Sequence, residues 1–206
     1  MITSLPKVTK KPNVYFKSNN RIFIAGKTGS GKTTLGLVTL YPVKRLIVID
    51  SKDGLFDWNL DEYNPKTTLD KIRTNQDIRV RIVQDEDAFA AMSAAYDSGN
   101  VIIYIDEVTR LITTPKPPQV IIDVWTRGRS RNIGAWAVTQ RPVSVPLIFM
   151  SEAEHFFMFR LNLDEDRKRM SEFMGREVRK NPLDKYGFWY YHEGDEKSKY
   201  YSKLDL

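Results

Sequence analysis

The sequence predicts an α/β fold in which a mostly parallel central sheet is flanked by helices on both faces. Short, fully apolar runs alternate with segments of helical character, which is the pattern of strands that are buried on both sides. A glycine-rich segment lies between the first apolar run and the first helix, and the most apolar run ends in two acidic residues. In a parallel sheet, residues that follow the strands meet at one edge, where ligands bind.

Each element is predicted from its local pattern. The predicted strands are the apolar runs 21–25, 45–50, 80–83, 101–106, 135–139 and 155–160. The predicted helices are 32–40, 86–96, 118–126 and 163–174. Glycine, asparagine and proline interrupt residues 51–71, so this segment is predicted to be mostly loop. The segments 186–191 and 199–203 flank a polar stretch and predict a C-terminal β-hairpin.

Length and composition set further bounds. The 206 residues predict a single domain, with a basic N-terminal arm at 1–20 and the hairpin with a tail at 185–206. The net charge of +6 favours a polyanionic partner, nucleic acid above all. No apolar run approaches the ~20 residues of a transmembrane helix, and the first residues do not resemble a signal peptide, so an intracellular protein is expected. The absence of cysteine excludes disulfides and cysteine-bound metals.

The glycine-rich segment predicts a phosphate-binding loop. Its residues match the pattern G-x-x-x-x-G-K-[ST] in full: Gly26, Lys27, Thr28, Gly29, Ser30, Gly31, Lys32 and Thr33. The glycines let successive backbone N–H groups face phosphate oxygens, and the following helix adds the positive end of its dipole. Lys32 is expected to neutralise the β- and γ-phosphates, Thr33 to ligate Mg²⁺, and Thr34 to belong to the same nucleotide site.

The two acids after the strand 101–106 predict the metal-binding and water-activating groups. A buried strand delivers its last residue, Asp106, to the sheet edge beside the phosphate loop, where a carboxylate can hold Mg²⁺ directly or through water. Glu107 comes one residue later, points elsewhere, and is placed to orient or deprotonate an attacking water. The alternative is that both acids merely solubilise a strand end.

The acid pair favours ATP hydrolysis over other nucleotide chemistry. A kinase of this class transfers phosphate to a second substrate and does not need a residue that activates water, so Glu107 favours an ATPase. No guanine-reading N-K-x-D run is present, which disfavours a GTPase.

Two further segments carry candidate site residues. The turn 126–132 contains Arg127, Arg129 and Arg131, and an arginine that a neighbouring subunit supplies can stabilise charge on a transferring phosphoryl group. The alternatives are a solvated basic loop and a contact with DNA phosphate. The strand 135–139 ends in Thr-Gln-Arg-Pro, which places Gln140 where it could sense the γ-phosphate, although an ordinary strand-end turn would have the same sequence.

The order of these motifs resembles the HerA/FtsK superfamily of DNA-pumping ATPases. The matching features are GKTGSGKT at 26–33, IDSKDG at 49–54, YIDE at 104–107, RGRSRNIG at 127–134 and TQRP at 139–142. The arginine turn followed by a strand ending in Thr-Gln-Arg-Pro is the most specific of them. The chain is similar to the minimal branch of this family, which includes the genome-packaging ATPases of tailless icosahedral viruses, often viruses with an internal membrane.

The resemblance implies a P-loop NTPase of the RecA-like, additional-strand type, in which one strand lies between those carrying the phosphate loop and Asp106. It also implies ATP and Mg²⁺ as cofactors and a ring, commonly a hexamer, around double-stranded DNA. The catalytic roles of the family fall on Lys32, Glu107 and Gln140, and its arginine finger falls on Arg129 or Arg131. The accessory barrel of HerA and the winged-helix domain of FtsK are not found in the sequence. Their roles in chromosome segregation and end resection are therefore not expected of this chain.

These features predict an ATP-driven DNA translocase that packages a viral genome in the host cytoplasm, with a capsid vertex or a viral membrane protein as docking partner and some association with the virion. The alternatives are an ATPase that drives phage assembly or protein export, a small-molecule kinase, and a nucleotide-gated structural protein. The charged helix 163–174 and the aromatic cluster 186–191 could contact nucleic acid, but a solvated face and hairpin packing explain them as well.

Overall fold

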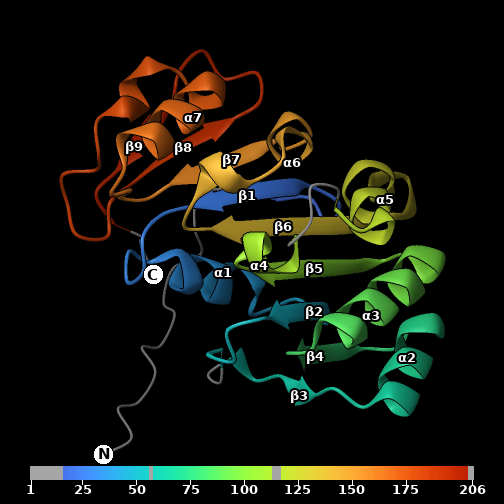
Figure 1. Ribbon diagram of the computed structural model, residues 1–206. Coiled ribbons are helices and arrows are strands. Elements are labelled where there is room, and N and C mark those ends of the chain that lie inside the picture. Colours follow the sequence, from blue (N-terminus) through green and yellow to red (C-terminus); the bar gives the residue numbers. More distant parts are fainter. Residues whose placement is uncertain (1–15, 56–57, 113–116, 204–206) are drawn as a thin grey trace, which may run out of the picture.

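The computed structural model describes residues 16–55, 58–112 and 117–203, which form an α/β domain (Figure 1). Within these residues one sheet has the strand order β3-β4-β2-β5-β6-β1-β7-β8-β9. The strands are β1 Arg21–Ala25, β2 Arg45–Asp50, β3 Asp61–Glu62, β4 Ile78–Ile82, β5 Val101–Asp106, β6 Ile133–Thr139, β7 His155–Met158, β8 Phe188–His192 and β9 Lys199–Tyr201. Strands β1 to β7 are parallel, and β8 and β9 continue the sheet as an antiparallel hairpin. The predicted parallel sheet and C-terminal hairpin are confirmed.

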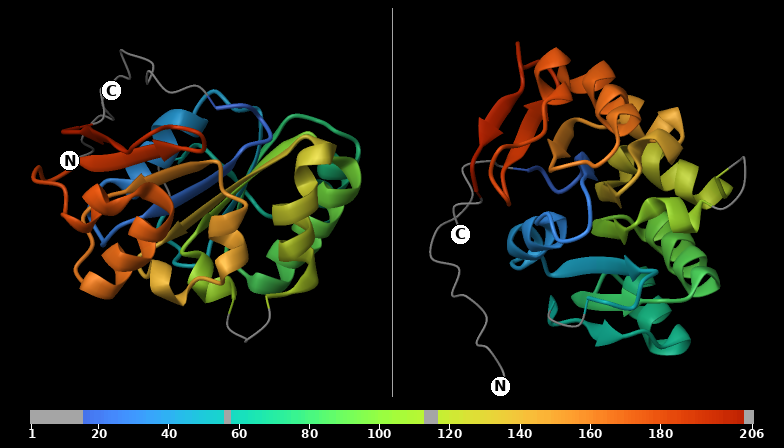
Figure 2. Two further views of the ribbon diagram at one scale, coloured as in Figure 1. Left: turned by 90° about the horizontal axis from the view of Figure 1, so that it is seen from above. Right: turned by 60° about the vertical axis from the view of Figure 1, so that its left-hand side comes forward.

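Helices cover both faces of the sheet, as Figure 2 shows from above. The α-helices are α1 Lys32–Leu40, α2 Pro65–Arg73, α3 Asp85–Ser98, α4 Val108–Leu111, α5 Gln119–Arg127, α6 Leu147–Ser151 and α7 Asp164–Met174. Short 3₁₀ helices are η2 Gly128–Arg131, η3 Pro142–Ser144 and η4 Arg176–Arg179. Helix α1 lies on one face, and α2, α3, α5, α6 and α7 lie on the other.

Alternate residues of the central strands build two separate cores. On β1, Phe23 and Ala25 pack with the larger helical layer, whereas Ile22 and Ile24 pack with α1. This two-residue period follows from the pleat, which points successive side chains to opposite faces. Because every residue of β1 is buried, the phosphate loop begins from a strand that is fixed on both sides.

The strand order decides which residues meet at the carboxyl edge of the sheet. Strand β6 lies between β1 and β5, so the predicted intervening strand is confirmed. Ala25 at the end of β1 is in register with Thr139 at the end of β6, and Asp106 at the end of β5 is in register with Asp50 at the end of β2. Four strands thus deliver their last residues to one edge, which is the left-hand edge in Figure 1.

The predicted loop is confirmed for the described residues before Asp61, but β3 and α2, which lie within or across the range 51–71, were not predicted. Asn64 and Pro65, read as loop signals, are the start of a helix. The side chain of Asn64 accepts a hydrogen bond from the backbone N–H of Thr67, and Pro65 occupies the first helical turn, where a missing N–H is tolerated. Thr68 and Ile72 of this helix are buried.

Other differences are smaller. Strand β4 begins two residues earlier than predicted, and the short elements α4, α6, η3 and η4 were not predicted because each is only about one turn long. Residues 1–15 of the predicted basic arm lie outside the described residues, but Phe16 packs edge-on against Trp136 and His155. No helix in the described ranges is long and apolar enough to cross a membrane.

Candidate nucleotide-binding site

The segment 26–31 forms a tight loop between β1 and α1. Gly29 and Gly31 have φ angles of 73° and 109°, in a region that residues with side chains rarely adopt. Gly26 has no room for a side chain, because an added Cβ would lie 2.6 Å from Cβ of Phe159 and 2.7 Å from Oγ of Ser30. The glycines are therefore required by the shape of the loop itself.

Backbone hydrogen bonds fix both flanks of this loop. The N–H of Gly26 donates to the carbonyl of Thr139 at 3.1 Å, and the N–H of Lys27 donates to the carbonyl of Arg160 at 2.8 Å. The loop is thus held between the ends of β6 and β7. Helix α1 has no side-chain cap at its N-terminus, so its first N–H groups point into the loop without a side-chain acceptor. This arrangement suits a bound phosphate chain.

Lys32 is buried at the start of α1, and its ammonium donates to the carbonyl of Lys27 at 2.9 Å. Burial lowers the pKa of Lys32 to about 8, and the nearby charge of Lys52 adds to this, whereas Asp106 and Glu107 oppose it. An anion in the loop would raise the pKa of Lys32 again, because a nearby negative charge favours the charged ammonium. The side chains of Thr33 and Thr34, in the same helical turn, are exposed.

Glu107 follows β5 with φ 63° and ψ 70°, a left-handed conformation that is uncommon for a residue with a side chain. This conformation turns its carboxylate toward the end of β6. Oε1 accepts hydrogen bonds from Oγ1 of Thr109 at 2.7 Å, from Oγ1 of Thr139 at 3.0 Å and from the N–H of Gln140 at 3.2 Å. Burial raises the pKa of Glu107, but hydrogen bonds from Thr109 and Lys52 outweigh burial and leave the pKa below its ordinary value.

The other oxygen of Glu107 faces a lysine that the sequence reasoning missed. Nζ of Lys52 lies 2.9 Å from Oε2, and only 8% of the Glu107 side chain is exposed. Lys52 belongs to the loop after β2 and lies within the segment 49–54, whose resemblance to the family assigns it no role. Its role depends on β2 and β5 being neighbours, which a single sequence does not show.

The Lys52–Glu107 pair is expected to stabilise the fold. Lys52→Met leaves a buried carboxylate without its cation, so the free energy of unfolding should fall by about 1–3 kcal/mol. Lys44→Met is the matched control, because the Lys44–Asp77 pair is 79% and 71% exposed, and it should change stability by less than about 0.5 kcal/mol. Urea unfolding of both variants measures the difference. Equal losses in the two variants would contradict a structural role for the Lys52–Glu107 pair.

Asp106 ends β5 beside a second buried carboxylate. Burial raises the pKa of Asp106, and Asp50 adds to the rise, while Lys52 and Lys32 oppose it. Oδ2 of Asp50 accepts from the N–H groups of Gly54 and Leu55, both at 2.8 Å, whereas its buried Oδ1 has no hydrogen-bond partner among the described residues. Nη1 of Arg81 also lies 3.3 Å from Oδ2, so Asp50 is paired through one oxygen and unsatisfied at the other.

These groups fit a magnesium ion that is shared with a nucleotide. Mg²⁺ prefers oxygen ligands, and it commonly takes one or two carboxylates with the rest from phosphates and water. Asp106 supplies a carboxylate and Thr33 an exposed hydroxyl. No group of three or more acidic, histidine or cysteine side chains suited to a metal is found in the described part of the chain.

Gln140 lies between the phosphate loop and the acid pair. Its backbone N–H donates to Glu107, and its side-chain Oε1 accepts from Oγ1 of Thr28 at 2.9 Å. One residue therefore joins the loop to the buried carboxylate.

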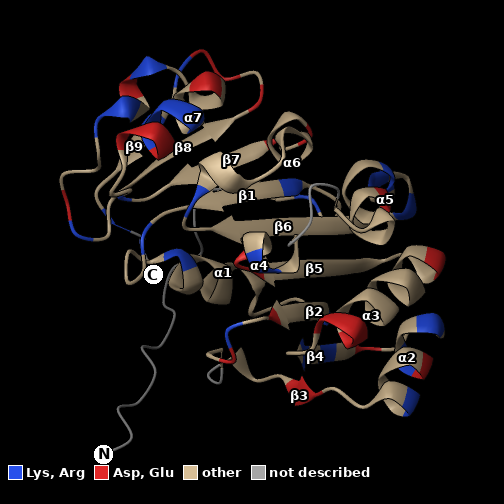
Figure 3. Cartoon of the chain, viewed as in Figure 1, with Lys and Arg blue, Asp and Glu red and all other residues tan. Residues whose placement is uncertain are grey.

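The arginine turn lies at the opposite edge of the sheet. It precedes β6, whereas the phosphate loop follows β1, and these strands are parallel. The seven residues of β6 separate the two edges by about 20 Å. Figure 3 shows basic residues at the end of α5, away from the start of α1. The turn therefore cannot reach the phosphate loop of its own chain.

Each arginine of the turn has a partner at that distant edge. Arg127 pairs with Asp123 at 3.3 Å, and Nη2 of Arg129 lies 3.0 Å from Oε2 of Glu154. Arg131 donates to the carbonyl of Tyr96 at 3.1 Å and lies 4.4 Å from the centre of the Tyr96 ring.

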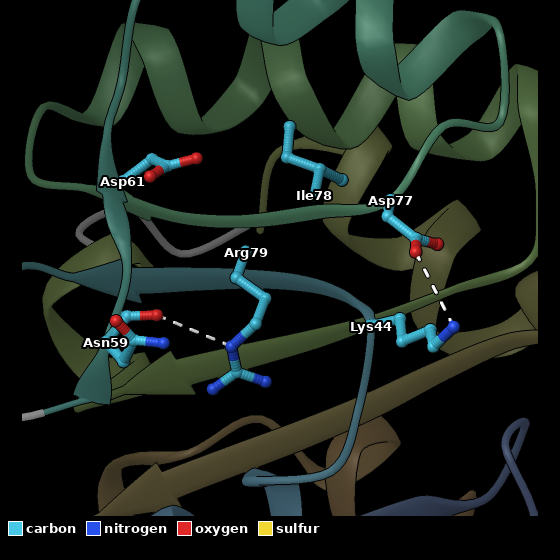
Figure 4. A pocket seen from close by; sticks show the side chains of 6 residues that line it. All are labelled: Lys44, Asn59, Asp61, Asp77, Ile78 and Arg79. Atoms are coloured by element: carbon cyan, nitrogen blue, oxygen red, sulfur yellow. Dashed lines mark hydrogen bonds and ion pairs between the residues drawn. The ribbon is translucent and has the colours of Figure 1, made fainter.

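A hollow of about 300 Å³ lies elsewhere, and the residues that line it are drawn in Figure 4: Lys44, Asn59, Asp61, Asp77, Ile78 and Arg79. It lies near the start of β4, away from the carboxyl edge. Arg79 donates there to the carbonyls of Leu40 at 2.9 Å and Trp58 at 3.1 Å. These contacts explain Arg79 as a structural residue that satisfies loop carbonyls.

Comparisons with known proteins agree with this geometry. No protein-family model matches the sequence. The chain is 27% identical over 172 residues to the DNA packaging ATPase P9 of Enterobacteria phage PRD1, which covers 78% of this chain and 72% of P9. This similarity confirms the resemblance to genome-packaging ATPases that the motif order predicts.

Solved structures show the same fold. The genome packaging NTPase B204 of Sulfolobus turreted icosahedral virus 2, in complex with AMPPCP, superposes with a TM-score of 0.74 at 20% identity over 92% of this chain and 100% of B204. VirB4 of Thermoanaerobacter pseudethanolicus superposes with a TM-score of 0.65 at 10% identity over 91% of this chain and 90% of VirB4. The P-loop NTPase fold is confirmed.

Proposed function

We propose that this chain is an ATPase that moves double-stranded DNA and packages a viral genome into a preformed capsid. One observation carries the proposal: the phosphate loop 26–33 and the acids Asp106 and Glu107 lie at one sheet edge, and Gln140 joins the loop to Glu107. The similarity to the packaging ATPase P9 supports the choice of DNA as the cargo.

ATP binds with its β- and γ-phosphates in the loop 26–31. Backbone N–H groups and the start of α1 receive the phosphate oxygens, and the ammonium of Lys32 exchanges the carbonyl of Lys27 for the phosphates. Asp106 and Thr33 would hold Mg²⁺, which supplies neutralisation of the phosphate charge when it is bound. B204 in complex with AMPPCP supports a nucleotide triphosphate at this site.

Glu107 orients a water toward the γ-phosphorus and accepts its proton. Three hydrogen bonds hold Oε1 in place, so Oε2 is the oxygen that can turn to the water once Lys52 moves aside. The water oxygen forms a bond to the γ-phosphorus while the bond to the β–γ bridging oxygen breaks, which gives ADP and phosphate. Gln140 reports the loss of the γ-phosphate through its contacts with Thr28 and Glu107.

The distant arginine turn is explained if the protein works as a ring, most simply a hexamer. A turn about 20 Å from its own phosphate loop can still reach the loop of an adjacent copy. Arg129 or Arg131 then leaves its present partner and contacts the γ-phosphate across the subunit boundary.

Mixed rings test this trans arrangement. Of Arg129→Ala and Arg131→Ala, the variant that removes the finger is expected to lose ATPase activity, as Glu107→Gln does. When one arginine variant is mixed with Glu107→Gln, boundaries form in which one subunit supplies an intact Glu107 and its neighbour an intact arginine. Part of the activity should therefore return, and phosphate release measures it.

Arg127→Ala is a comparison variant on the same turn, because Arg127 pairs with Asp123 within α5. Two differently tagged wild-type preparations must exchange subunits under the same conditions for the mixture to be informative. Recovery with neither Arg129→Ala nor Arg131→Ala, despite proven exchange, would contradict the trans arginine.

DNA is the polyanion that the net charge of +6 suits. The ring surrounds the duplex and docks at a capsid vertex or on a viral membrane protein, in the cytoplasm of the host cell. The direct test is ATP hydrolysis with and without a long duplex at low salt. Hydrolysis that DNA accelerates supports the proposal, whereas hydrolysis that DNA does not change favours an ATPase that drives phage assembly or protein export. Phosphate transfer to a nucleoside in place of water would favour a kinase.

A further inference from the structure

The strand order gives the direction of a bound nucleotide. The acids at the end of β5 and Gln140 at the end of β6 lie on one side of β1, and β7 and β8 lie on the other side. On the proposed function, the γ-phosphate faces Glu107 and Gln140. The α-phosphate, ribose and base must then extend from the loop toward the β7–β8 side. The groups on that side are therefore the ones that meet the base.

The segment 181–187, which leads into β8, occupies that side and is firmly held. The N–H of Leu161 donates to Oδ1 of Asn181 at 2.9 Å, and Nδ2 of Asn181 donates back to the carbonyl of Leu161 at 2.8 Å. Arg160, whose carbonyl accepts from the phosphate loop, donates to the carbonyl of Pro182 at 3.1 Å. The segment is thus tied to the same strand end that holds Lys27.

Tyr186 of this segment lies against the phosphate loop. A Cβ built on Gly31 would lie 3.8 Å from Cδ1 of the Tyr186 ring, which is van der Waals distance. Hairpin aromatics further along are buried, with Phe188 at 4% and Tyr190 at 6% exposed, whereas Tyr186 is 49% exposed. A large ring that is half exposed and adjacent to the loop is placed to contact a ligand rather than the core.

The contact that the Tyr186 ring makes with Lys185 can be replaced by a contact with a nucleobase. Nζ of Lys185 lies 5.0 Å from the centre of the Tyr186 ring. A cation–π contact of an exposed lysine is weak, and stacking of a nucleobase on an aromatic ring is stronger. A purine ring can therefore take the place of the lysine.

We propose that Tyr186 is the stacking platform for the nucleobase of the bound nucleotide, so that one chain supplies both the phosphate loop and the base subsite. The inference rests on the proposed function for the orientation of the triphosphate. It assigns a binding role to the connection before β8, outside the motifs that define the phosphate site.

Two probes separate stacking from phosphate binding: ATP, and inorganic tripolyphosphate, which has the phosphates but no base. Calorimetry is done on the full chain with Mg²⁺ for the wild type, Tyr186→Ala and Tyr186→Phe. Tyr41→Ala is the matched control, because Tyr41 is an exposed aromatic at the far end of α1 from the loop. Thermal unfolding of each variant checks that it is folded.

We expect Tyr186→Ala to weaken ATP binding by about 10-fold or more, with tripolyphosphate changed by less than about 2-fold. Tyr186→Phe and Tyr41→Ala should bind both probes as the wild type does. Equal weakening of both probes would assign Tyr186 to the shape of the loop and overturn stacking, as would ATP binding that Tyr186→Ala leaves unchanged. A folded wild type that binds no ATP would instead overturn the proposed function, on which the inference rests.

Discussion

Lys32→Ala is expected to weaken ATP binding by about 100-fold or more and to abolish measurable hydrolysis. The Lys32 ammonium is the buried cation of the phosphate loop, and charge-assisted hydrogen bonds to phosphate are among the strongest that a side chain makes. Burial lowers the pKa of Lys32 to about 8, so below that pH the charged side chain destabilises the folded state. Removing it should therefore leave the variant folded. Calorimetry with ATP and a phosphate-release assay measure both effects.

Lys44→Ala controls for the loss of one lysine, since the side chain of Lys44 is 79% exposed and lies away from the loop. It should bind and hydrolyse ATP as the wild type does. Tight ATP binding by a folded Lys32→Ala variant would mean that the segment 26–33 does not hold the triphosphate.

Glu107→Gln is expected to retain ATP binding but to lower the rate of hydrolysis by roughly 10²- to 10⁴-fold, the usual contribution of a general base. A glutamine keeps the size of the side chain, and its amide oxygen can still accept from Thr139 and the N–H of Gln140. It cannot take a proton from water. Single-turnover hydrolysis of ATP, measured beside equilibrium binding, separates the two effects.

Glu86→Gln, on the exposed surface of α3, is the control for loss of one carboxylate and should hydrolyse ATP normally. If Glu107→Gln lost ATP binding and hydrolysis together, Glu107 would be part of the binding site rather than the base. If it hydrolysed ATP at the wild-type rate, a different group would have to activate the water.

Much of the phosphate edge could be predicted because its signals are local. The loop 26–33 carries its geometry in its own glycines, and a buried strand that ends in Asp106 and Glu107 delivers carboxylates to the carboxyl edge wherever it lies in the sheet. The intervening strand came from the family resemblance, and β6 confirms it. The roles of Lys32, Glu107 and Gln140 in catalysis stay predictions.

The parts that could not be predicted depend on which strands are neighbours. Lys52 reaches Glu107 only because β2 lies beside β5. Thr139 reaches Glu107 only because β6 lies on the other side of β5. Helix α2 was missed for a different reason, since asparagine and proline mark both loops and the first turn of a helix. The position of the arginine turn at the opposite edge follows from the parallel direction of β6, so on the proposed function an arginine finger would have to come from a second copy of the chain.

Movement of the protein along DNA is measured most directly by triplex displacement. A labelled third strand is bound to a long duplex, and its release is followed after ATP is added to the wild type or to Glu107→Gln. The wild type is expected to release the third strand only with ATP, and Glu107→Gln should leave it bound. A wild type that hydrolyses ATP in the presence of this duplex but never releases the third strand would contradict a DNA translocase.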